Sequence, residues 1–199
     1  MSHPTSQAGA YKVLPTVPKT VLLIIAGSLL MTLAAKVQVP FYPVPMSMQT
    51  LVAIGLGLSA GPVVGVAAIL LYLGQGLVGL PVFSGSGAGP AYMMGPTGGY
   101  LVGFVLAAFV AGTLAQAGYA RTAVRAGFCA LLAGALVYLP GLVWLGQFTG
   151  YGTTLLVAGL FPFLAGDVIK AIIAGLISAG LNASSRNNLT HKSHETLKK

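Results

Sequence analysis

The sequence predicts an all-α, polytopic membrane protein with six transmembrane helices. Composition is the first reason: of 199 residues, 56% are hydrophobic and only 6% are charged, whereas a soluble domain carries about 25% charged residues. Such a chain cannot build the surface of a soluble, secreted or disordered protein. The second reason is that the apolar runs are long and unbroken, which argues against the alternating segments of a β-barrel. The third is that the breaks between runs leave segments close to the length of a membrane span.

The predicted helices end at Pro, Gly or charged residues. A polar segment with several prolines, residues 1–17, precedes the first apolar run. That run resembles the core of a signal peptide, but further spans follow, so we interpret it as the first helix. Gly61 and Pro62 predict a tight turn between a short second helix and the third. The predicted helices are 18–38, 46–60, 62–79, 96–118, 124–147 and 152–182.

Two of the predicted connections are irregular. Gln38–Pro45 is rich in Pro, and Leu80–Pro96 is rich in Gly, Ser and Pro. Irregular backbone at membrane depth is tolerated only where it lines or covers a cavity. We therefore predict one transmembrane domain over residues 18–185, with cytoplasmic tails at 1–17 and 186–199.

The basic residues predict the orientation. With six spans, both tails lie on one side of the membrane, together with the connection between the second and third helices and the connection between the fourth and fifth. On the opposite side, Lys36 is the only basic residue. Because Lys and Arg are enriched on the cytoplasmic side, both termini are predicted to be cytoplasmic, and Lys36 is expected to extend toward the outer interface. The basic residues on the predicted inner side are Lys12, Lys19, Arg121, Arg125, Arg186, Lys192, Lys198 and Lys199.

Several function classes are excluded by what the sequence lacks. The net charge of +8 comes from the tails and one short loop, so no nucleic-acid-binding face is expected. Cys129 is the single cysteine and the three histidines lie in the tails, so neither a metal site nor a disulfide is expected. No phosphate-binding loop, paired acids or nucleophile–base set is present. We therefore predict no cofactor and no enzymatic activity, and any ATP-driven role would need separate ATPase subunits.

Glycine accounts for 28 residues, about twice the usual frequency. Pairs of small residues four positions apart, such as Gly99 and Gly103, predict close packing of helices.

Asp167 is the only acid before the C-terminal tail, and Lys170 follows it on the same helical face. An ionised group at the bilayer centre costs roughly 2.5–3.5 kcal/mol, so its presence needs an explanation. A self-neutralising pair that fixes helix packing is one explanation, and a polar ligand site or an ion relay is the other. A ligand site is favoured over a relay because the lysine keeps the acid ionised.

Other polar positions carry weaker signals. In Gly95–Tyr100, glycine and proline allow close approach of backbone to a ligand. Thr97 is a candidate cap whose helix would offer N–H groups to a carboxylate, although plain capping explains it equally well. Gln49 and Gln75 are candidates for either interhelical hydrogen bonds or ligand contacts.

Three segments together resemble one family. FYPVPMSMQTL (41–51), YLGQGLVGLPVFSGSGAGPAYMMGPTGGYLVGF (72–104) and GDVIK (166–170) resemble the BioY family, the biotin-specific S components of energy-coupling factor (ECF) transporters. The resemblance implies the six-helix S-component fold and a biotin pocket covered by the two irregular connections. It also implies a bacterial cytoplasmic membrane, a transmembrane coupling subunit and two ATPase subunits as partners, although some members are thought to act without them.

The resemblance also implies ligand contacts. Asp167 and Lys170 match the family's polar pair, and the Gly95–Tyr100 stretch is expected to line the site. Biotin suits these groups, because its ureido N–H can meet a carboxylate and its own carboxylate or ureido oxygen can meet a cation. The predicted ligand-binding residues are Gln49, Gln75, Phe83, Tyr92, Gly95, Thr97, Tyr100, Asp167 and Lys170.

One feature departs from the family pattern. S components often carry Ala four residues apart on the first helix for docking to the coupling subunit, whereas this helix has Ser28 and Thr32 at that spacing. The alternatives to biotin binding are an S component for another vitamin, a membrane enzyme that uses Asp167 and Lys170, and a structural membrane subunit.

Overall fold

The computed structural model describes the backbone of residues 17–196 and the side chains of residues 17–180. Apart from Val17, the predicted tail 1–17 lies outside the described residues. So do residues 197–199 of the second predicted tail, and nothing is described of the side chains of residues 186–196 within it.

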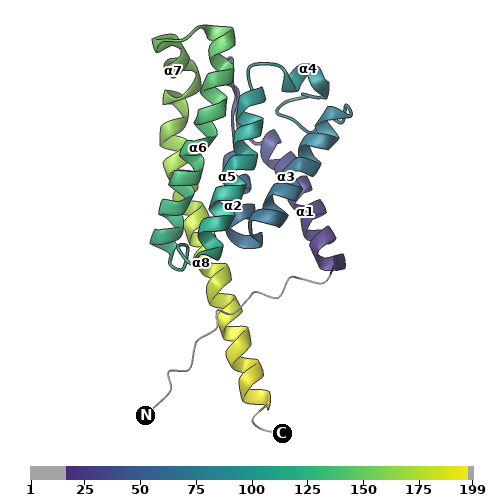
Figure 1. The fold of residues 1–199 in the computed structure, drawn as a ribbon, viewed down its shortest axis with the longest axis vertical. Coiled ribbons are helices and arrows are strands. Elements are labelled where there is room, and N and C mark those ends of the chain that lie inside the picture. The colour runs from purple at the N-terminus through teal and green to yellow at the C-terminus, as the bar shows by residue number, and fades with distance from the viewer. Residues whose placement is uncertain (1–16, 197–199) are drawn as a thin grey trace, which may run out of the picture.

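The regular secondary structure of the described residues is helical except for two short strands (Figure 1). Among the described residues, four helical stretches are long and apolar enough to cross a membrane, namely α1, α5, α6 and residues Thr153–Gly180, while α2 and α3 are shorter apolar helices. The prediction of a helical membrane protein is therefore confirmed at this level. The elements are α1 Val17–Lys36, β1 Gln38–Val39, β2 Met46–Ser47, α2 Gln49–Ala60, α3 Pro62–Leu77, α4 Gly89–Met93, α5 Gly98–Gln116, α6 Ala123–Thr149, α7 Thr153–Gly159 and α8 Phe161–Thr196.

The structure corrects the predicted start of the second helix. Residues 46–47 form β2, which pairs antiparallel with β1 in the register Gln38↔Ser47, and α2 begins only at Gln49. The prolines between the two strands remove backbone donors and prevent a helix from continuing through them. The connection after α1 is thus a small folded hairpin.

The predicted last helix, 152–182, is wrong in two respects. It is divided into α7 and α8 at Leu160, where ψ is −63° and φ is −128°. Pro162 explains the break, because its ring disfavours helical continuation from the preceding turn. At the other end, α8 continues to Thr196, since no further proline interrupts it. Figure 1 shows this C-terminal extension leaving the bundle.

Helix α5 lies at the centre of the bundle and packs against α2, α3 and α6 (Figure 1). Glycines bring these helices into backbone contact: a Cβ on Gly57 would lie 2.3 Å from the Ala108 carbonyl oxygen, and one on Gly99 would lie 2.2 Å from the Pro140 carbonyl oxygen. The predicted role of small residues in close packing is confirmed at these interfaces.

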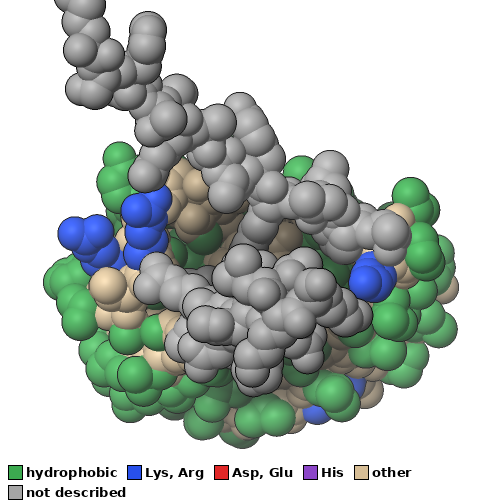
Figure 2. Space-filling model, turned by 90° about the horizontal axis from the view of Figure 1, so that it is seen from below, with side chains coloured by type: hydrophobic (Ala, Val, Ile, Leu, Met, Phe, Trp, Pro, Cys, Tyr) green, Lys and Arg blue, Asp and Glu red, His purple; other side chains and the backbone are tan. Residues whose placement is uncertain are grey.

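The two ends of the bundle differ. At one end, which we call the tail end, the α2–α3 turn at Gly61 lies beside Gln116 at the end of α5, and Figure 1 places the start of α1 and the α5–α6 connection there too. The opposite end, which we call the loop end, carries the β1–β2 hairpin, residues 78–97 and α7. Viewed from the tail end, hydrophobic side chains surround the bundle, and Lys and Arg side chains lie on this face (Figure 2).

The sides of the bundle are lined by large exposed apolar residues, which a water-soluble protein would bury. Examples of such exposed residues on the outer helices are Leu22, Leu33, Val63, Val143, Ile169 and Leu176. This surface suits lipid.

Candidate ligand-binding site

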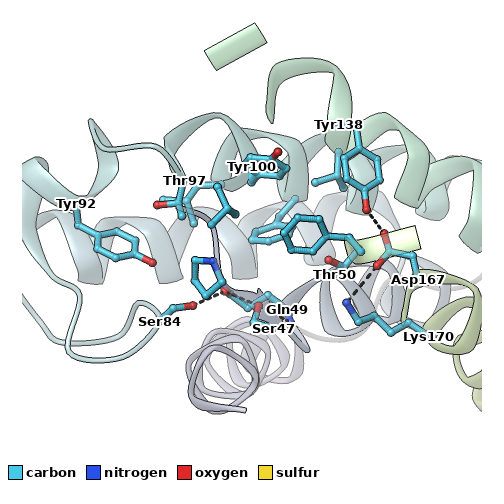
Figure 3. A pocket seen from close by; sticks show the side chains of 16 residues that line it. Ser47, Gln49, Thr50, Ser84, Tyr92, Thr97, Tyr100, Tyr138, Asp167 and Lys170 are labelled. Carbon is cyan, nitrogen blue, oxygen red and sulfur yellow. Dashed lines mark hydrogen bonds and ion pairs between the residues drawn. The ribbon is translucent and has the colours of Figure 1, made fainter. Parts of the chain in front are cut away.

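A cavity lies between α2, α5, α6 and α8, beneath the β1–β2 hairpin and the loop between α3 and α4 (Figure 3). The cavity and its mouth hold about 520 Å³ of space free of protein atoms, open solvent at the mouth included. Its lining combines aromatic rings with a few polar groups. The lining residues are Val44, Pro45, Ser47, Gln49, Thr50, Ser84, Tyr92, Thr97, Tyr100, Leu101, Phe104, Val137, Tyr138, Phe163, Asp167 and Lys170.

One end of the cavity is a three-residue polar cluster (Figure 3). The Lys170 ammonium donates to Asp167 Oδ1 at 3.1 Å, and the Tyr138 hydroxyl donates to the other carboxylate oxygen, Oδ2. Both members of the ion pair are largely shielded, with side chains 7% exposed for Lys170 and 17% for Asp167. The carboxylate is thus held on both oxygens, with its lysine still facing the cavity.

Local sequence sets this end of the cavity. The helix α8 begins at Phe161 and projects residues three apart from one face, so Asp167 and Lys170 point the same way. Gly166 has no side chain, and a Cβ there would lie 3.1 Å from Met46 Sδ. The glycine therefore lets the β1–β2 hairpin lie close over the start of α8.

A second polar group is centred on Gln49. Its amide Nε2 donates to the Tyr72 hydroxyl at 2.8 Å, and its Oε1 accepts from Ser47 Oγ at 2.9 Å and from Ser84 Oγ at 3.3 Å. Gln49 is 4% exposed. It both joins α2 to α3 and lines the cavity, so the two interpretations left open for it are compatible.

Aromatic side chains form the remaining walls. Tyr92 lines the cavity and stacks on Phe83, with ring centroids 4.9 Å apart. Tyr100 and Phe163 lie on the other side with centroids 6.4 Å apart. The Tyr100 hydroxyl donates to the Gly159 carbonyl at 2.8 Å, so its ring, rather than its hydroxyl, is presented to the cavity.

The Gly95–Tyr100 stretch differs from the prediction at one point. Thr97 is the residue before α5, but its side chain makes no capping hydrogen bond. Its backbone is in the right-handed helical region, with φ −83° and ψ −10°, whereas side-chain capping requires an extended conformation. Thr97 instead lines the cavity.

A second hollow, with about 730 Å³ of space free of protein atoms, open solvent included, adjoins the cavity at the loop end. Gln38 lines it, and the side-chain Oε1 of Gln38 has no hydrogen-bond partner among the described residues. We call it the surface hollow. It and the cavity share four lining residues, which therefore separate the cavity from the surface: Pro45, Ser84, Tyr92 and Thr97.

The cavity brings together six of the nine predicted ligand-binding residues. These are Gln49, Tyr92, Thr97, Tyr100, Asp167 and Lys170.

Three predicted residues lie elsewhere. Gln75 accepts a hydrogen bond from Ser28 Oγ at 2.7 Å, which joins α1 to α3. Phe83 is fully buried behind Tyr92. Gly95 lines the surface hollow, and its carbonyl accepts from the Trp144 indole at 2.9 Å.

Tyr138 is the principal residue that the sequence reasoning missed. A tyrosine in the middle of an apolar span is a polar group that needs a partner, and this could have singled it out. Ser47 and Ser84 lie within the quoted motifs, but serine is too common in loops to be distinctive. Among the side chains of residues 17–180, no group of three His, Cys, Asp or Glu could hold a metal ion.

The fold and the cavity define a class: a helical membrane protein with a partly enclosed site for a small molecule that has both polar and apolar parts. Comparison with known proteins identifies the family. Residues 6–187 match the BioY family, so the chain belongs to the BioY family, and the resemblance inferred from its sequence motifs is confirmed.

Individual relatives agree. The chain is 36% identical over 168 residues to the probable biotin transporter BioY of Pyrococcus horikoshii, covering 84% of this chain and 98% of the relative. It is 37% identical over 145 residues to the biotin transporter BioY of Rhizobium etli, covering 69% and 77%. Both relatives are named as transporters, in agreement with the prediction that the chain is not an enzyme.

A solved structure shares the fold. The crystal structure of the S-component for biotin from an ECF-type ABC transporter superposes with a TM-score of 0.75 and 27% identity, covering 83% of this chain and 92% of that chain.

Proposed function

We propose that this chain is a biotin-binding S component that takes up biotin across the cytoplasmic membrane. Its family membership, the names of its relatives and the fold it shares with a biotin S-component all support this function. The observation that carries the proposal is the cavity, which places a carboxylate and an ammonium at one end and hydroxyl and amide groups elsewhere, with aromatic walls between them.

The shape of the site suits an elongated ligand with polar ends. In Figure 3, Tyr138, Asp167 and Lys170 lie at one end of the cavity, and Tyr92, Ser84 and Thr97 lie toward the other. Biotin has a ureido group at one end and a carboxylate at the other, joined by an apolar bicycle and chain. Lys170 and Asp167 would bind one polar end, and the hydroxyls of Ser84 and Thr97 would bind the other.

The proposed topology has six crossings with both termini in the cytoplasm. The four long helical stretches would each cross once. Helices α2 and α3 would complete the bundle, because their shorter length can be accommodated where they pack against protein rather than lipid. The loop end would then face the outside, and biotin would enter through the surface hollow.

The proposed partners are a transmembrane coupling subunit and two ATPases. The Ser28/Thr32 pair is not an exposed docking surface, because Ser28 is fully buried and the Thr32 hydroxyl donates to the Ser28 carbonyl at 3.1 Å. A coupling subunit would therefore meet the large exposed side chains of α1, such as Leu22 and Leu29, rather than a groove of small residues.

Titration calorimetry of the purified chain in detergent tests the proposed ligand. We expect stoichiometric heat with biotin and none with thiamine or riboflavin. Heat with another vitamin and none with biotin would instead indicate an S component for that vitamin. No heat with any of the three would favour a structural subunit.

A further inference from the structure

Lys36, the last residue of α1, is bound by the loop between α3 and α4, residues 78–88. Its ammonium donates to the carbonyl oxygens of Pro81 at 2.7 Å, Phe83 at 2.8 Å and Gly85 at 2.7 Å. A lysine ammonium has three donors, and all three are used. The sequence predicted that the Lys36 side chain extends toward the outer interface. In the structure, its ammonium is hydrogen-bonded to this loop.

The loop also has backbone hydrogen bonds of its own, from the Val82 N–H to Leu80, from the Phe83 N–H to Gly87 and from the Gly87 N–H to Ser84. Pro81 has no backbone N–H to donate, and Gly85 adopts a positive φ of 62°. Among the described residues, no backbone hydrogen bond outside the helices and strands uses the three carbonyls that Lys36 binds. Hydrogen bonds to an ionised donor are roughly twice as strong as neutral ones, so Lys36 adds three strong contacts at carbonyls that these backbone bonds leave free.

The same loop forms part of the wall of the candidate site. Phe83, fully buried, stacks on Tyr92 and meets Tyr72 edge to face. The Ser84 hydroxyl donates to Gln49 Oε1 at 3.3 Å. Ser84 and Tyr92 both lie between the cavity and the surface hollow. Any loosening of residues 81–85 would therefore open the cavity toward the surface.

We propose that Lys36 is a positioning residue that holds residues 81–85 closed over the candidate site and thereby slows ligand release. Lys36 does not line the cavity and contacts the ligand site only through the loop. The effect on release rests on the proposed function, whereas the effect on the loop does not.

Release kinetics test the first part. In Lys36→Met, which keeps a long side chain without donors, we expect labelled biotin to dissociate about tenfold faster or more while its association rate is not reduced. Lys36→Arg retains a cation with donors and should restore much of the slow release, although its planar group cannot match three converging carbonyls. Lys19→Met removes the same charge from the first turns of α1 and should leave release unchanged.

A cysteine probe tests the second part without any ligand. Val82 lies between two of the bound carbonyls and is 8% exposed. In a Cys129→Ala background, Val82→Cys should be protected from a membrane-impermeant maleimide, and adding Lys36→Met should raise its labelling rate about tenfold. Lys36→Gln provides a second variant should the Met variant be misfolded by size-exclusion chromatography.

The two experiments distinguish failure of the Lys36 proposal from failure of the proposed function. Unchanged protection of Val82→Cys, or unchanged release of biotin, in folded variants without the lysine would overturn the proposal. A wild-type chain that binds no biotin would overturn the proposed function, and the maleimide result alone would then decide whether Lys36 holds the loop.

Discussion

Asp167 illustrates how a charge is kept within an apolar helix. Its two oxygens are bound by different partners, Tyr138 from α6 and Lys170 from its own helix. The pairing offsets part of the cost of burial, and the tyrosine fixes the direction of the carboxylate. A charge so oriented beside an open cavity suits a ligand contact better than packing alone, because a packing role would not need the cavity.

Removing the Tyr138 hydroxyl tests this orientation. Tyr138→Phe keeps the ring and its packing beside Tyr100, but leaves Asp167 free to turn. A hydrogen bond to a charged group contributes about 1.5–3 kcal/mol, and if about half of this is lost from binding, the affinity for biotin falls roughly three- to twelvefold. Calorimetry on the purified variant measures this.

The matched control is Tyr151→Phe. Tyr151 donates its hydroxyl to the Val143 carbonyl at 3.0 Å, in an exposed position, and lies outside the cavity lining. The affinity of the Tyr151→Phe variant for biotin should equal that of the wild type. Equal affinity in the Tyr138 variant too would show that the hydroxyl does not position the carboxylate for the ligand.

The sequence identified the ion pair but not the tyrosine, for a physical reason. Asp167 and Lys170 are conspicuous because charge is rare in this chain and their spacing on one helix is readable. Tyr138 comes from a different helix, and which of eight tyrosines meets the acid depends on how α6 is rotated against α8. That rotation is set by tertiary packing, which periodicity along one helix does not reveal.

At the scale of the elements, glycine contacts between α2 and α5 determine how closely the helices lie. Gly57→Ala would place a Cβ 2.3 Å from the Ala108 carbonyl oxygen, so the helices must move apart. Overpacking of this kind costs about 1–3 kcal/mol. We expect a lower thermal unfolding temperature in detergent, measured with a thiol-independent fluorescence assay.

Gly55→Ala is the control on the same helix. A Cβ at Gly55 meets nothing within 4 Å, and alanine favours helix over glycine by about 0.8–1 kcal/mol. This variant should be as stable as the wild type or slightly more so. A Gly57→Ala protein that unfolds at the same temperature as Gly55→Ala would contradict the packing described for α2 and α5.

The elements were predictable to different degrees. The long apolar runs predicted the bounds of α1, α3, α5 and α6 to within two residues, because the length of each run and the Pro, Gly or charged residues at its ends define the helix. The β1–β2 pairing was not predictable, since two residues on each side carry no pattern. The break at Leu160 could have been found from Pro162, but the surrounding hydrophobicity favoured one continuous span.

At the scale of the whole molecule, the two ends of the bundle should face opposite sides of the membrane. In a Cys129→Ala background, Ser86→Cys in the exposed α3–α4 loop should react with an impermeant maleimide on intact cells, while Arg121→Cys and Glu195→Cys should react only after lysis. The asymmetry of Lys and Arg is the physical reason. Labelling of position 121 or 195 on intact cells would contradict the proposed orientation.

The central claim is that the polar pair of α8 belongs to the ligand site and is not merely structural. The most direct test is equilibrium binding of labelled biotin to the purified chain carrying both Asp167→Leu and Lys170→Met. Removing both charges leaves no unpaired ion, so the variant should remain folded and monodisperse. We predict that its affinity for biotin falls by about 100-fold or more, since two charge-assisted contacts of about 1.5 kcal/mol each are lost. A folded double variant that binds biotin as tightly as the wild type would contradict the claim.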